Sequence, residues 1–195
     1  MDSTITVGIT GGIGTGKSII CRALSIMGYP VFYSDDQAKL ILENDPLTIE
    51  KVKEFFGESA YRDSKPDRGY IASKIFNQPE LRSALNSIIH PKVRQKFVEW
   101  SENQNSSVVF NEAAILFETG AYKNFSYTIL ITAPEEIRIN RIKKRDQAAA
   151  EEIRKRMASQ WPDEQKIPMA DFVIENDDQK AVLPQLSGIL KKIKP

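Results

Sequence analysis

The sequence predicts an α/β fold in which a five-stranded parallel sheet forms the middle layer of a three-layer core. Short apolar runs rich in Val, Ile and aromatic residues recur along the chain. These runs are mostly continuous rather than alternating, which is typical of strands covered on both faces. Helical periodicity separates them, as expected for strand–helix–strand units. The expected strands are residues 4–10, 31–33, 107–111, 127–132 and 172–175.

Three expected helices of this core have recognisable ends. The first, over residues 18–27, precedes Gly28, a residue that favours helix C-termini. The second, over 134–145, opens on a proline followed by Glu135 and Glu136, which suit the positive end of a helix dipole. The last, over 179–193, ends in a lysine-rich turn.

Residues 35–104 break this alternation, because they show helical periodicity and no convincing strand. Loop signals appear around residues 57–69, at Pro79 and at Pro91. We therefore expect a core made of residues 1–34 and 106–195. Residues 35–105 would form a helical domain inserted between the second and third strands.

A phosphate-binding loop follows the first expected strand. Residues 11–18 read Gly-Gly-Ile-Gly-Thr-Gly-Lys-Ser, which fits G-x-x-x-x-G-K-[ST] between a strand and a helix. Glycines let the backbone amides turn inward around phosphate oxygens, and the helix adds its positive end. Lys17 would reach the β- and γ-phosphates and Ser18 would hold Mg²⁺. The expected nucleoside triphosphate contacts are Gly12, Ile13, Gly14, Thr15, Gly16, Lys17, Ser18 and Ile19.

The composition is that of an ordinary soluble enzyme. The formal net charge of +1 argues against a protein whose main role is binding nucleic acid or an anionic membrane. The single cysteine, Cys21, precludes an intrachain disulfide and is expected to pack in the first helix. There is no leader pattern and no apolar run long enough to span a bilayer, so the expected compartment is the cytoplasm.

Two carboxylates end expected strands, where the ligand crevice of an open α/β sheet lies. Asp35 follows the second strand, and it is either a general base for an attacking hydroxyl or a helix cap beside Ser34. Asp36 is expected to stabilise the next helix by interacting with the positive end of its dipole. Glu112 ends the third strand, and it either orders Mg²⁺ through water or simply starts a helix.

Basic residues gather between residues 138 and 166, where nine basic side chains oppose five acidic ones. Arg138, Arg141 and Arg145 are three and four residues apart, so they share one helix face. This segment is either a mobile cationic lid over a triphosphate or an ordinary solvated face. His90 is the single histidine, so no His-rich metal site is expected. The proline that follows it, Pro91, predicts that a helix breaks at this point.

A phosphate loop alone does not identify the reaction. The chain has no Asn-Lys-x-Asp motif of guanine-specific switches, and its size with a helical insertion favours a small-molecule kinase. Three alternatives remain at this point. They are a kinase for another acceptor, such as a nucleoside monophosphate or a shikimate-like alcohol, a slowly hydrolysing regulatory protein, and a weak nucleic-acid binder, which the near-neutral charge disfavours.

Further motifs make the chain resemble the dephospho-coenzyme A kinase family, nearly end to end. The combination of the phosphate loop with a His-Pro pair, a Leu-Phe-Glu triplet and a late Ala-Asp…Asn is specific to that family. The matching residues are Gly8–Ser18, Ser34-Asp35 with Ala38, Leu85-Asn86 with His90-Pro91, Ile115–Glu118, Arg141, Arg145-Asp146, Arg156, Gln160, Lys166, Ala170–Ile174 and Asn176.

The resemblance implies a P-loop kinase core with a helical substrate-binding insertion and a short helical lid at about 138–166. It implies transfer of the ATP γ-phosphoryl, with Mg²⁺, to the 3′-hydroxyl of dephospho-CoA. Asp35 would be the base. Arg141 and Arg145 would contact ATP phosphates, and Asn176 would lie at the nucleotide. His90 and Glu118 would lie at the acceptor.

Three positions depart from the family pattern. Tyr33 stands where an Asp is usual, Glu112 replaces an Asp, and Ala114 replaces a proline. None of these changes removes a group that the reaction needs. The resemblance leaves the oligomeric state open and is compatible with a monomer.

Overall fold

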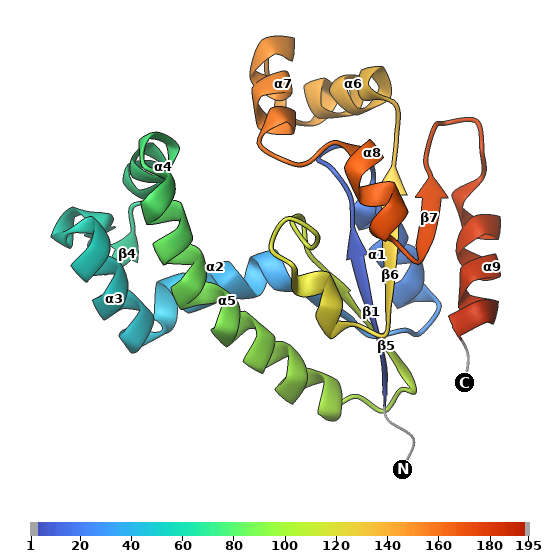
Figure 1. Ribbon diagram of the computed structural model, residues 1–195, viewed down its shortest axis with the longest axis horizontal. Helices are drawn as coiled ribbons and strands as arrows, with labels where there is room; N and C mark the ends of the chain where they lie inside the picture. The colour runs from blue at the N-terminus through green and yellow to red at the C-terminus, as the bar shows by residue number, and fades with distance from the viewer. Residues whose placement is uncertain (1–3, 194–195) are drawn as a thin grey trace. The chain divides into compact units, whose positions relative to one another are not determined.

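The computed structural model describes residues 4–193 and divides the chain into two compact units (Figure 1). The first unit contains the chain up to Tyr33 and the chain from Gln104 onward. The second unit is Ser34–Asn103. Each unit has a hydrophobic core of its own.

The first unit is built on a parallel sheet with the strand order β2-β5-β1-β6-β7, which confirms the predicted fold class. In the central strand, Ile5 pairs with Val108 of β5 and Val7 pairs with Tyr127 of β6. Because neighbouring strands are parallel, their carboxyl ends lie along one edge, where ligands bind in such sheets. The strands are β1 (Ile5–Thr10), β2 (Val31–Tyr33), β5 (Val108–Glu112), β6 (Tyr127–Thr132) and β7 (Phe172–Glu175).

The two faces of the sheet are covered differently. On one face, Val7 and Ile9 of β1 are fully buried in a cluster with residues of α1 (Lys17–Ile26) and α9 (Val182–Ile193). On the other face, the segment that follows β5 lies directly on Gly8. A Cβ atom added to Gly8 would lie 2.7 Å from the Leu116 side chain. The glycine in this strand therefore permits close approach of the segment that carries part of the site.

Helix α1 ends as the sequence predicts. Gly28 has a φ of +87°, its N–H donates to the Ser25 carbonyl, and the Tyr29 N–H donates to the Leu24 carbonyl. This is the Schellman arrangement, which satisfies carbonyls at the end of a helix.

The remaining helices of the first unit lie between β5 and β7 along the chain, most of them in the predicted lid segment, residues 138–166. Ile139, Ile142 and Ile153 form a small core against which Ile13 packs. These helices are α6 (Glu135–Asp146), α7 (Ala150–Ala158), α8 (Asp163–Lys166) and the 3-10 turns η2 (Ala121–Asn124) and η3 (Ile167–Met169).

Helix α9 begins at Val182, three residues later than predicted. The side chain of Asp177 accepts hydrogen bonds from the N–H groups of Gln179 and Lys180, and Asp178 has a φ of +62°. These local bonds form a turn that competes with the helix.

The second unit is mainly helical, as predicted. Val52, Phe56, Ile71 and Ile88 are buried together in its core. Its elements are α2 (Ser34–Asn44), α3 (Pro46–Phe56), η1 (Glu58–Ala60), β3 (Tyr61–Arg62), β4 (Lys65–Pro66), α4 (Arg68–Asn77) and α5 (Pro79–Glu102).

Two predictions for this unit were wrong. The loop expected at residues 57–69 contains the two-residue antiparallel ladder of β3 and β4. Asp63 and Ser64 both have positive φ, which is the geometry of tight hairpin turns. In addition, α5 continues through Pro91 instead of breaking there. Buried residues such as Ile89 and Val93 lie on both sides of the proline, so packing outweighs the missing hydrogen bond.

Among residues 4–193, no helix is long and apolar enough to cross a bilayer.

Candidate active site

The loop between β1 and α1 is folded back on itself by its own hydrogen bonds. The Thr15 side chain is fully buried, and its hydroxyl donates to the Gly12 carbonyl over 2.8 Å. The Thr15 N–H donates to the same oxygen over 3.2 Å. Gly16, the N-cap of α1, has a φ of +96°. The first N–H groups of a helix have no partners within it, so this loop presents donors to an anion.

Lys17 connects the loop to the end of β5. Its Nζ donates to the Gly11 carbonyl over 2.8 Å and lies 3.8 Å from Oε1 of Glu112. Both side chains are largely buried. The structure thus brings together two of the predicted site residues, a cation for phosphates and a carboxylate at a strand end.

Cys21 lies on α1, where the charges of Lys17 and Glu112 act on its thiol. Burial, with a further contribution from the negative charge of Glu112, raises the pKa of Cys21 to about 12. The thiol therefore stays protonated at neutral pH and acts as a packing group, as the sequence predicts.

Arg141 and Asn176 hold the loop through its carbonyl groups. The Asn176 amide donates to the Thr15 carbonyl over 2.7 Å. The Arg141 guanidinium donates to the carbonyls of Gly14 and Thr15 over 3.3 Å each, and to the Asn176 carbonyl and side-chain oxygens over 3.1 Å. It also pairs with Asp178. Two predicted residues thus meet at the loop backbone, and their contacts with ATP stay predictions.

Two residues of the predicted lid segment, 138–166, hold the tip of the loop at Ile13. The Ile13 N–H donates to the Gln160 side chain over 2.8 Å, and the Ile13 carbonyl accepts from Nε of Arg138 over 2.9 Å. The Gln160 amide also donates to the Ala114 carbonyl over 3.3 Å. Gln160 therefore joins the phosphate loop to the segment that follows β5.

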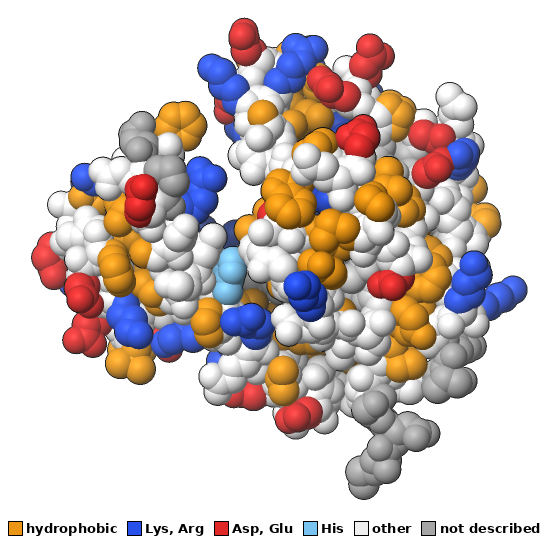
Figure 2. Space-filling model, viewed as in Figure 1, with side chains coloured by type: hydrophobic (Ala, Val, Ile, Leu, Met, Phe, Trp, Pro, Cys, Tyr) orange, Lys and Arg blue, Asp and Glu red, His pale blue; other side chains and the backbone are white. Residues whose placement is uncertain are grey.

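Arg145 lies elsewhere on the lid. Its guanidinium donates to both oxygens of Asp146, over 2.6 and 3.0 Å, and its side chain is largely exposed. Arg156 donates to the same carboxylate and to Glu152. Figure 2 shows acidic and basic side chains interleaved over α6 and α7. Much of the predicted excess of positive charge is therefore paired within the lid.

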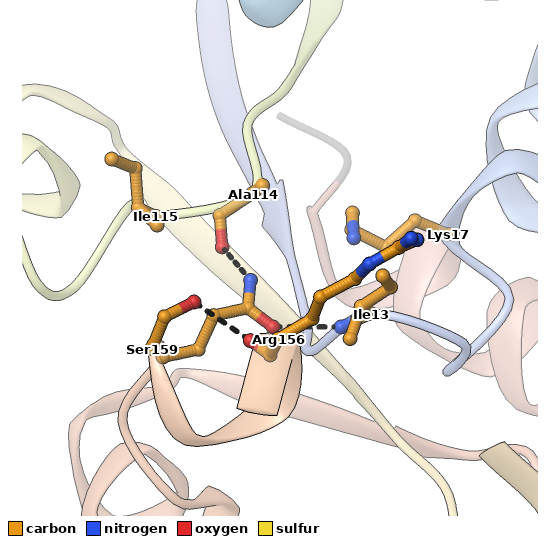
Figure 3. A pocket seen from close by; sticks show the side chains of 7 residues that line it. Ile13, Lys17, Ala114, Ile115, Arg156 and Ser159 are labelled. Carbon is orange, nitrogen blue, oxygen red and sulfur yellow. Dashed lines mark hydrogen bonds between the residues drawn. The ribbon is translucent and has the colours of Figure 1, made fainter. Parts of the chain in front are cut away.

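A pocket of about 320 Å³ lies beside the loop. Figure 3 shows the Arg156 side chain extending across this pocket in the direction of Lys17. These two cations are the charged groups of the lining, so the pocket suits an anion. The lining residues are Ile13, Lys17, Ala114, Ile115, Arg156, Ser159 and Gln160.

The oxygen donors near this loop fit a Mg²⁺ ion that is shared with nucleotide phosphates. Ser18 lies exposed in the first turn of α1, and Glu112 ends β5. Hydroxyl and carboxylate oxygens are the ligands that Mg²⁺ takes in phosphoryl-transfer sites, together with phosphates and water. Within the described part of the chain, no group of three or more His, Cys, Asp or Glu side chains is arranged to hold a metal.

Glu118 is largely buried and contacts the segment predicted to form a lid. Its Oε1 accepts a hydrogen bond from the Trp161 N–H over 3.1 Å and lies 4.0 Å from Nζ of Lys166. Its predicted contact with the acceptor stays a prediction.

In the helical unit, Asp35 and His90 influence one another. Asp35 is exposed in the first turn of α2, and His90 lies on α5, which packs against α2. Burial and the charge of Arg94 lower the pKa of His90, whereas the charge of Asp35 acts in the opposite direction. Asp36 forms an ion pair with Lys39 over 2.7 Å.

The lowered pKa of His90 predicts a pH effect on stability. The unfolded chain, with an ordinary histidine pKa of 6.5, binds this proton more readily than the folded chain does. The contribution of His90 to the free energy of unfolding is therefore complete above pH 6.5 and is lost as the pH falls from that value through the lower pKa of the folded state. Denaturant unfolding between pH 5 and 8 should show a steeper acid loss in the wild type than in His90→Gln. Because the chain has one histidine, parallel curves for the two proteins would contradict this assignment.

Sequence reasoning missed the contacts of four residues: Arg138 and Gln160 bind the backbone of Ile13, and Asp163 and Lys166 form a largely buried ion pair over 3.3 Å. In the sequence, Arg138 is one of three arginines on a basic helix face. Periodicity does not tell which of the three side chains is buried. Asp163 and Lys166 are an i, i+3 pair of opposite charge, which usually indicates a solvated ion pair. Their burial depends on tertiary contacts that carry no local signal.

The chain is similar over nearly its whole length to known proteins. Residues 5–181 match the family model for dephospho-CoA kinase. The dephospho-CoA kinase of Bacteroides fragilis is 37% identical over 187 residues, covering 95% of this chain and 91% of that protein. A crystal structure from Thermus thermophilus superposes with a TM-score of 0.86 at 34% identity, covering 98% of this chain and 97% of that one. The dephospho-CoA kinase of Campylobacter jejuni gives a TM-score of 0.68 at 28% identity, with 96% of each chain covered.

Proposed function

The chain belongs to the dephospho-CoA kinase family, and on this premise we propose that it transfers the γ-phosphoryl group of ATP directly to the 3′-hydroxyl of dephospho-CoA. The products are ADP and coenzyme A. The observation that carries this proposal is the match to the family over residues 5–181, a span that includes the phosphate loop, the helical unit and the lid.

ATP binds to the phosphate loop. The amides of residues 12–19 and the start of α1 hold the phosphates, and Lys17 contacts the β- and γ-phosphates. Arg141 and Asn176 keep the loop in shape from its carbonyl side, which supports this assignment. Arg145 leaves Asp146 and neutralises phosphate charge as the lid, residues 138–166, closes.

Ser18 and Glu112 would hold the Mg²⁺ that accompanies ATP, Glu112 through water. When bound, the ion neutralises phosphate charge. Lys17 lies 3.8 Å from Glu112, so these residues would lie beside the phosphates that they serve.

Dephospho-CoA binds to the helical domain, residues 35–105. Asp35 orients the acceptor hydroxyl and accepts its proton, which makes the oxygen a better nucleophile. His90 lies close enough for its pKa to respond to Asp35, and it contacts the acceptor. Glu118 contributes from the segment that follows β5. We propose that this reaction takes place in the cytoplasm.

The test is to mix the purified protein with Mg²⁺, ATP and dephospho-CoA and to quantify ADP and 3′-phosphorylated product. Equal amounts of ADP and coenzyme A are expected. ADP formation that does not depend on any acceptor would favour a regulatory ATPase instead. If nucleoside monophosphates or shikimate-like alcohols stimulate ADP formation in place of dephospho-CoA, the acceptor assignment is wrong.

A further inference from the structure

Four charged side chains form a nearly enclosed row in the first unit. Glu118 follows β5, Asp163 and Lys166 belong to α8, and Arg138 lies on α6. The Lys166 side chain is 1% exposed, and the other three are at most 14% exposed. Lys166 Nζ lies 4.0 Å from Glu118 Oε1 and 3.3 Å from Asp163 Oδ1, and Asp163 Oδ2 lies 3.7 Å from an Arg138 nitrogen.

The row ends on the phosphate loop. Arg138 donates from Nε to the Ile13 carbonyl over 2.9 Å. Its guanidinium also covers Gly12, where an added Cβ atom would lie 2.2 Å from an Arg138 nitrogen. Hydrogen bonds and ion pairs therefore connect the segment that follows β5 to the loop tip, by way of α8 and α6.

Stability does not explain this row. Removing charges from water is costly, and buried ion pairs often contribute less than apolar side chains of similar volume. Within the described residues, Lys166 Nζ, Glu118 Oε2 and Asp163 Oδ1 are buried without a hydrogen-bond partner, which adds to the cost. An apolar core would hold α8 in place at least as well.

Both ends of the row contact the wall of the pocket beside Lys17. Trp161, whose N–H donates to Glu118, follows directly after Gln160, which lines that pocket. The loop tip lies at the other end of the row, and Ile13 also lines the pocket. The contacts of Gly14 and Thr15 with Arg141 are separate from this row.

We propose that Lys166 is a positioning residue for phosphoryl transfer. By bridging Glu118 and Asp163 it aligns Gln160 and the tip of the phosphate loop around the pocket in which the transferred group lies. Lys166 does not touch the substrates. The Ile13 N–H at the loop tip donates to Gln160, so ATP binding in the ground state depends on the other loop amides and on the Arg141 contacts. Lys166 therefore acts on turnover rather than on affinity. This inference rests on the proposed kinase activity.

The test compares Lys166→Met with Lys191→Met, a matched change at an exposed lysine of α9, outside the proposed lid. Rates are measured with Mg²⁺, ATP and dephospho-CoA, and ATP affinity is measured by calorimetry. Lys166→Met should lower kcat at least tenfold, while the KM for each substrate and the ATP affinity change less than threefold. Lys191→Met should match the wild type, and Lys166→Arg should recover part of the lost kcat.

The single variant leaves two carboxylates against one cation and can lose stability for that reason alone. The double variant Asp163→Asn with Lys166→Met restores the charge balance and keeps Glu118, so its unfolding midpoint should return toward that of the wild type. Its kcat should stay low. Recovery of both stability and kcat in the double variant would mean that Lys166 only balances charge, and would overturn the proposal, as would wild-type kcat in Lys166→Met. An inactive wild type would instead refute the proposed function.

Discussion

Replacing Asp35 by asparagine should lower turnover about a hundredfold or more, which is the contribution of a well-placed general base. The amide has nearly the size of the carboxylate but neither accepts the hydroxyl proton nor carries the charge. ATP affinity should stay nearly unchanged, because the proposed ATP contacts of residues 12–19 lie in the other unit of the chain. Steady-state rates at saturating substrates, with calorimetric ATP binding, measure both quantities.

Asp36→Asn provides the control. Asp36 is the neighbouring carboxylate on α2, and its partner is Lys39. Its replacement should leave turnover within about twofold of the wild type, since an exposed ion pair contributes less than about 1 kcal/mol. Asparagine and aspartate cap helices about equally well, so a lost helix cap does not explain a drop in Asp35→Asn. Near-normal turnover in Asp35→Asn would rule out the base assignment.

Gly16→Ala should reduce kcat/KM for ATP about a hundredfold or more. Gly16 has a φ of +96°, where an L side chain costs about 1–2 kcal/mol. The added methyl group would lie 2.3 Å from Nδ2 of Asn176, which donates to the Thr15 carbonyl. Asn176 or the loop backbone must therefore move, and misplaced phosphate donors of this kind cost about 10²–10³-fold. Initial rates at varied ATP measure the loss.

Gly28→Ala separates backbone strain from damage to the site. Gly28 has a similar φ of +87°, but an added Cβ atom would meet nothing within 4 Å. This variant should lose about 1–2 kcal/mol of unfolding free energy and keep its kcat/KM for ATP. Equal kinetic losses in the two variants would show that strain in α1, rather than the contact with Asn176, sets the effect.

The parallel sheet was predictable because its strands are buried on both faces and therefore read as continuous apolar runs. Val7, Ile9, Ile129 and Ile131 are all fully buried. The phosphate loop was predictable because its backbone needs glycine at fixed positions. Both signals lie within a few neighbouring residues, where a single sequence is most informative.

The remaining features depend on contacts between distant residues. Pro91 signals a helix end locally, yet the packing of α5 on both sides of it maintains the helix. Asp63-Ser64 forms a tight turn without the Asn-Gly or Asp-Gly pair that would have indicated it. The sequence places Arg138 and Arg141 on one helix face, but not their contacts with carbonyls of a loop more than a hundred residues away.

The hydrogen bonds at Ile13 and Thr15 have an entropic consequence. Side chains from α6, from the residue after β7 and from the segment after α7 hold the loop at its tip and near the start of α1. Fixing one residue's backbone costs about 1–2 kcal/mol, and at these positions the protein's own hydrogen bonds offset part of that cost on folding. Binding energy from the phosphates is therefore free to drive lid closure rather than to order the loop.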